Sequence, residues 1–79
     1  MRPPEVLVRE LSAQAGSRLK HLSRNGRYRC TRQRAMILLC SATGMSAPEI
    51  ASTVLSDESH VRKVIHDFNE RGFGALDPD

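Results

Sequence analysis

The last third of the chain carries apolar residues at the spacing of an α-helix. Four of them fall at i, i+3, i+4 and i+7, namely Val61, Val64, Ile65 and Phe68. Asp57 can cap the start of this helix and Gly72 can end it, which predicts a helix over about 58–71. A helix with a single apolar stripe gains most of its stability by burying that stripe, so the rest of the chain must supply elements that cover it.

The segment just before this helix predicts a second, shorter helix. Ser46 and Glu49 have the spacing of a capping box, which marks its start. Its inner face would consist of Ile50, Ala51 and Val54. Residues 55–57 would then form a tight turn between the two helices.

The order of residues across this turn is informative. Ala51 is small enough to let two helices approach closely, and Val61, ten residues later, is the inward anchor of the next helix. A small residue, a turn and an inward β-branched residue in this order are typical of a helix-turn-helix. Leu55 stands where such turns often have glycine, so the turn either lacks a positive φ or is strained. The outward side chains of the second helix, which would face bases in a major groove, are Glu58, Ser59, Arg62, Lys63 and His66.

Two further helices are expected upstream. Ser12 can cap a helix over about 12–24, and Thr31 can cap a helix that ends at Gly44. The apolar stripe of the first consists of Ala15, Leu19 and Leu22. The run 35–40 in the second is apolar around most of its circumference, which predicts a central helix buried on several sides.

Residues 1–11 predict an extended arm, because Pro3 and Pro4 disfavour a helix there. Val6 and Leu7 are the side chains expected to dock on the body. No strand pattern or internal repeat is present, and 79 residues suffice for one small domain. The sequence therefore predicts an all-α bundle of three to four helices over residues 12–79.

Charge is distributed unevenly along the chain. No Asp or Glu occurs between Leu11 and Pro48, although that span holds seven Lys and Arg residues, whereas residues 49–79 hold seven acids and three cations. An uninterrupted basic segment favours a polyanionic partner over an ordinary solvated face. The residues expected to contact a phosphate backbone are Arg24, Arg27, Arg29, Arg32 and Arg34, with Ser46 at a helix start.

Several function classes are disfavoured by what the sequence lacks. It has no apolar run long enough for a membrane span and no apolar stretch typical of a secretory signal. Cys30 and Cys40 have no neighbours at metal-ligand spacing, which predicts free thiols in a reducing cytoplasm and no metal. No acid–base constellation suggests catalysis, so we expect no enzyme activity, cofactor or small-molecule substrate.

Four motifs resemble a known family. They are RAMILL, G-M-S-x-x-E-I-A, V-R-K-V-I-x-x-F and E-R-G-F-x-A-L, and the similarity extends over about residues 11–79. This stretch is similar to the N-terminal helix-turn-helix domain of bacterial insertion-sequence transposases of the mariner-type superfamily. The resemblance implies a homeodomain-like domain in the bacterial cytoplasm that binds the terminal inverted repeats of its element as double-stranded DNA. The catalytic domain of that family, with three metal-binding acids, has no counterpart in these 79 residues.

Other interpretations remain open at this point. The chain could serve as a stand-alone small regulator, or as a protein–protein module in which the acidic second half docks a basic partner or forms a homodimer. Arg62 and Lys63 could simply pair with Glu58 or Asp67 at i,i+4 spacing. Glu58 could favour the helix dipole or accept a hydrogen bond from cytosine. Ser59 and His66 could contact bases or only water.

Overall fold

The computed structural model describes residues 7–78, and within that range every regular element is helical. The four α-helices are α1 (Ala13–Asn25), α2 (Arg29–Ala42), α3 (Ala47–Val54) and α4 (Glu58–Arg71), followed by a 3-10 helix, η1 (Gly72–Ala75). The bounds of α4 agree with the predicted helix. The first six residues of the predicted arm, including Val6, and Asp79 lie outside the described residues.

Local capping starts three of the helices where the sequence predicts. The Ser12 hydroxyl accepts a hydrogen bond from the Ala15 amide at the start of α1. Ser46 and Glu49 form the complete capping box of α3. Asp57 accepts from the His60 amide at 2.8 Å and caps α4.

The prediction that Thr31 caps the central helix is wrong. α2 begins at Arg29, and its N-cap residue, Tyr28, makes no side-chain capping bond. Thr31 lies inside the first turn, where it is buried, and its hydroxyl donates to the Leu76 carbonyl at 3.0 Å. A tertiary contact therefore uses the side chain that local sequence assigned to a cap. The predicted end of α2 at Gly44 is close to the observed end at Ala42. Gly44 (φ 94°) lies just after the helix, and its amide donates to the Ser41 carbonyl.

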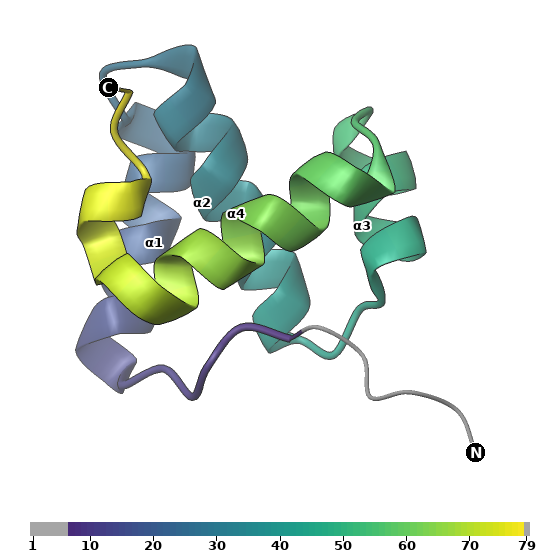
Figure 1. Cartoon of the computed structure of the whole chain (residues 1–79). Coiled ribbons are helices and arrows are strands. Elements are labelled where there is room, and N and C mark those ends of the chain that lie inside the picture. Colours follow the sequence, from purple (N-terminus) through teal and green to yellow (C-terminus); the bar gives the residue numbers. More distant parts are fainter. Residues whose placement is uncertain (1–6, 79) are drawn as a thin grey trace.

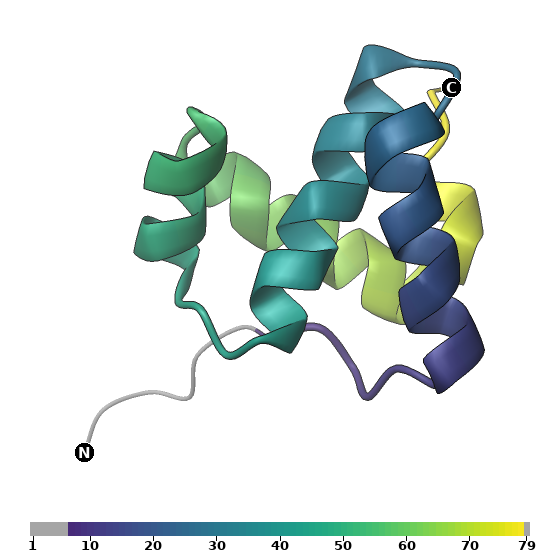
Figure 2. The ribbon, with the colours of Figure 1, turned by 180° about the vertical axis from the view of Figure 1, so that it is seen from behind.

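The helices enclose one apolar core. α1 and α2 run side by side in opposite directions (Figures 1 and 2). In the view of Figure 1, α4 crosses in front of α2, and α3 lies beside the N-terminal end of α4. The largest fully buried side chains come from all four helices and the C-terminal segment, and they are Leu19, Ile37, Leu38, Ile50, Val61, Ile65, Phe68 and Leu76. The predicted stripe of α4 thus faces the core in full, since Val64 is buried as well.

The segment after α4 folds back on the bundle. Phe73 packs edge-on against Phe68 with ring centroids 5.3 Å apart, and Leu76 is buried. Arg34 of α2 donates from Nη1 to the carbonyls of residues 75, 76 and 77 at 3.3–3.4 Å. These contacts bring the C-terminal segment beside both α2 and α4.

The described part of the arm, Leu7 to Ser12, has no regular secondary structure and crosses the bundle near the C-terminal end of α2 (Figure 1). Val8 donates from its amide to Ser41, and the Asn69 side-chain amide bonds the arm backbone on both sides of Val8. Val8 and Leu11 pack against the core, whereas Leu7 is 45% exposed. The expectation that Leu7 docks is therefore wrong, because the backbone bonds turn the next residue inward.

No helix among the described residues combines the length and apolar character needed to cross a membrane.

Candidate nucleic-acid interface

The turn between α3 and α4 spans three residues, and its first residue, Leu55, has a left-handed backbone (φ 59°, ψ 48°). This conformation lets the amides of Leu55 and Ser56 both donate to the Ala51 carbonyl, which ends α3. Ala51 and Val61 are both buried, and α3 packs against α4. Of the two outcomes expected for this turn, the structure therefore has the positive φ, adopted by leucine at a conformational cost of about 1–2 kcal/mol.

The side of α4 opposite its buried stripe is exposed and polar. It presents Glu58, Ser59, Arg62, Lys63 and His66, which are the five side chains predicted to face outward. The structure shows that all five are accessible along one helix of 14 residues.

Three of these five side chains have intrahelical partners. Arg62 Nη2 lies 3.0 Å from Glu58 Oε2, which is one of the pairings that the sequence allows, and both side chains are about half exposed. His66 Nε2 lies 3.4 Å from Glu70 Oε1, an ion pair only when the imidazole is protonated. Exposed pairs of this kind are worth roughly 0–1 kcal/mol, so a nucleic acid could displace either acid at little cost.

The five basic residues predicted to contact phosphates fall into two groups. Arg24, Arg27 and Arg29 are exposed around the connection between α1 and α2. Arg32 and Arg34 are partly buried and bond main-chain carbonyls, Arg32 donating to Gly26 at 2.7 Å. The first group is free to meet a polyanion, whereas the second group also holds the fold together.

Ser46 has its polar groups satisfied locally. Its amide and hydroxyl both donate to Glu49 Oε1, at 3.3 and 2.8 Å. A phosphate at this helix start would have to displace a carboxylate, which makes Ser46 the least favourable of the predicted backbone contacts.

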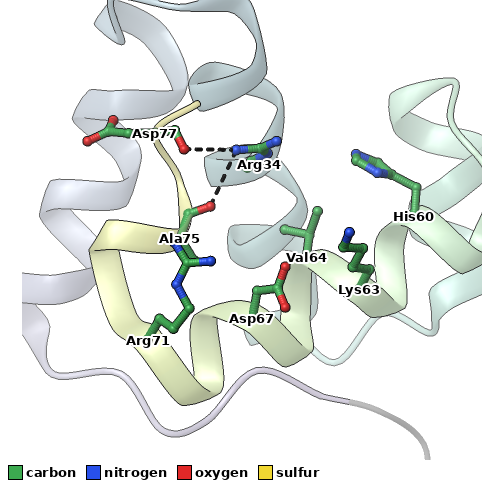
Figure 3. Close-up of a pocket in the computed structure, with 8 residues that line it drawn as sticks. All are labelled: Arg34, His60, Lys63, Val64, Asp67, Arg71, Ala75 and Asp77. Atoms are coloured by element: carbon green, nitrogen blue, oxygen red, sulfur yellow. Dashed lines mark hydrogen bonds between the residues drawn. The ribbon is translucent and has the colours of Figure 1, made fainter. Parts of the chain in front are cut away.

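A pocket of about 170 Å³ lies between α2, α4 and the C-terminal segment (Figure 3). It joins Arg34 and Lys63, which the sequence predicts as contacts but could not place together. It also includes His60 and Arg71, which the sequence predictions missed. The remaining lining residues are Val64, Asp67, Ala75 and Asp77.

A sequence signal for the missed residues exists. His60, Lys63, Asp67 and Arg71 are spaced by three or four residues, so they follow one flank of α4. That flank lies between the buried stripe and the outward face and becomes a pocket only because Arg34 and the C-terminal segment close its far side.

No protein-family model, curated protein or solved structure matches this chain.

Proposed function

We propose that this chain binds double-stranded DNA, with α3, the turn and α4 acting as a helix-turn-helix and α4 as its recognition helix. The observation that carries the proposal is the geometry at residues 47–71. A short helix and a 14-residue helix are joined by a three-residue turn that opens with a left-handed residue, they pack against each other, and the short helix buries the small residue Ala51. The outer face of α4 is left polar and exposed.

The dimensions of α4 suit this role. Its 14 residues extend for about 21 Å at 1.5 Å per residue. A helix about 10–12 Å across enters a major groove about 12 Å wide, and Arg62 can then bond guanine with two hydrogen bonds. Ser59, Lys63 and His66 would lie along the same face.

The attraction to DNA would come mainly from outside α4. Its outward face carries both signs of charge, since Glu58 and Glu70 accompany Arg62 and Lys63. Arg24, Arg27 and Arg29 are exposed in a segment without acids and can neutralise phosphates. In this proposal the basic α1–α2 connection attracts DNA, and α4, with its mixed charges, discriminates between base sequences.

The specific target proposed is the terminal inverted repeat of an insertion sequence. This part of the proposal is supported only by the resemblance of the four motifs to mariner-type transposases. A stand-alone regulator would instead recognise operator-like half-sites, and selection of preferred sites from a random duplex library distinguishes the two.

The proposal is tested by measuring affinity for a random-sequence duplex by fluorescence anisotropy at several salt concentrations. If about four phosphates are contacted, the logarithmic salt slope is about −3.6, and binding weakens roughly 150-fold between 50 and 200 mM salt. Absence of binding to every duplex at 50 mM salt would overturn the proposal and favour the protein–protein module. Replacing Arg24, Arg27 and Arg29 together by Gln should reduce the slope, and melting curves check that the variant folds.

A further inference from the structure

We infer that the pocket between α2, α4 and the C-terminal segment is a subsite for one backbone phosphate of the bound DNA strand. The inference rests on the proposed function and extends it. It assigns a role to His60 and Arg71, and it gives the flank of α4 a different task from its outward face.

The pocket has the size and the donors for a phosphodiester. Its volume of about 170 Å³ compares with the roughly 10–15 Å³ that one water requires, so a tetrahedral anion fits together with several waters. Lys63, His60 and Arg71 reach it from one flank of α4 (Figure 3). All hydrogen bonds that Arg34 makes within residues 7–78 come from Nη1, so Nε and Nη2 can donate to a ligand.

The position of the pocket also fits a DNA strand. A helix seated in the major groove nearly fills its width, so the two sugar–phosphate backbones pass along the flanks of the helix. The pocket lies on one such flank, and Lys63 belongs both to the pocket and to the predicted outward face. A phosphate bound there would set how deep α4 sits and along which direction it points.

The charge of the pocket favours an anion. Arg34, Lys63 and Arg71 surround the carboxylate of Asp67, whereas Asp77 turns its main-chain carbonyl toward Arg34 and its carboxylate away from the pocket (Figure 3), which leaves two net positive charges when His60 is neutral. A backbone phosphodiester carries one negative charge. Asp67 offsets part of the positive charge of the pocket, which predicts that removing its carboxylate strengthens DNA binding.

The test uses two pocket variants with opposite expected effects on affinity for a duplex that the wild type binds. Arg71→Gln should weaken binding about eightfold at 0.1 M salt, the contribution of one released counterion, and reduce the salt slope by about 0.9. Asp67→Asn should tighten binding roughly threefold, the Coulomb effect of one charge about 6 Å away in water. Both effects should be equal for preferred and random sequences, because a phosphate contact carries no sequence information.

The matched controls are Lys20→Gln on α1 and Glu10→Gln before it. Each makes the same change of charge at an exposed side chain that does not line the pocket. Melting curves check the fold, since Arg71 also donates to the Gly74 carbonyl at 3.3 Å. If Arg71→Gln fails to fold, the direction in which Asp67→Asn changes the affinity for DNA still tests the inference.

The inference is overturned if the pocket variants change affinity and salt slope no more than their controls while the wild type still binds DNA. That result would leave the proposed function standing. Failure of the wild type to bind any duplex at low salt would instead overturn the proposed function and this subsite with it.

Discussion

Replacing Leu55 by glycine should stabilise this protein. Leu55 holds a left-handed backbone (φ 59°, ψ 48°), which an L-residue adopts at a cost of about 1–2 kcal/mol. Its side chain is 91% exposed, so its removal forfeits almost no packing. The greater chain entropy of unfolded glycine offsets roughly 0.5–1 kcal/mol of the gain.

The net stabilisation expected for Leu55→Gly is therefore about 0.5–1 kcal/mol, the difference between relieved strain and lost chain entropy. For a domain of this size that corresponds to a rise in Tm of about 2–8 °C. Thermal and urea unfolding followed by circular dichroism measure both quantities. The m value should not change, because the substitution alters neither the core nor the surface exposed on unfolding.

The matched control is Leu55→Ala. Alanine also lacks the exposed leucine side chain but keeps the Cβ, so it retains the strain of the positive φ and should stay within about 0.5 kcal/mol of wild type. A glycine variant no more stable than the alanine variant would refute the reasoning, because it would show that Leu55 holds this backbone without strain.

Three further outcomes are expected. Asn69→Ala removes both bonds to the arm backbone and should lower stability by about 1 kcal/mol and speed amide exchange at Arg9, which donates to the Asn69 Oδ1 at 2.7 Å. Unchanged exchange at Arg9 would show that the arm is held by other contacts. Thr31→Val keeps the buried shape but removes the hydroxyl donor to the Leu76 carbonyl, at a cost of about 1 kcal/mol in urea unfolding, whereas Thr31→Ser keeps the donor. A valine variant as stable as wild type would show that this bond contributes nothing. Burial raises the pKa of the Cys40 thiol, so iodoacetamide should alkylate it more slowly at pH 8.5 than it alkylates a cysteine in an unfolded peptide, and equal rates would contradict this.

The local features of the helices follow from the sequence. The stripe and cap of α4, the capping box of α3 and the cap of α1 all match prediction. Each depends on residues three or four positions apart, so a few neighbouring side chains specify the element. The all-helical class is predictable for the same reason.

The candidate site is only partly predictable. The outward face of α4 follows from helical periodicity, and all five of its side chains are exposed as expected. The left-handed turn could be anticipated only as one of two outcomes, because the strain at Leu55 is decided by the contacts that hold α3 against α4.

Sequence alone therefore determined which segments are helices, which face of each is apolar and where the basic residues cluster, because these properties depend on near neighbours in the chain. Tertiary structure decided which side chains contact distant parts of the chain. Arg34 and Thr31 contact residues more than 40 positions away, at the carbonyls of the C-terminal segment. Those contacts move Thr31 from the expected cap into the core, and they place Arg34 opposite Lys63. No local pattern encodes such pairs, since they form only when distant segments pack over the same core.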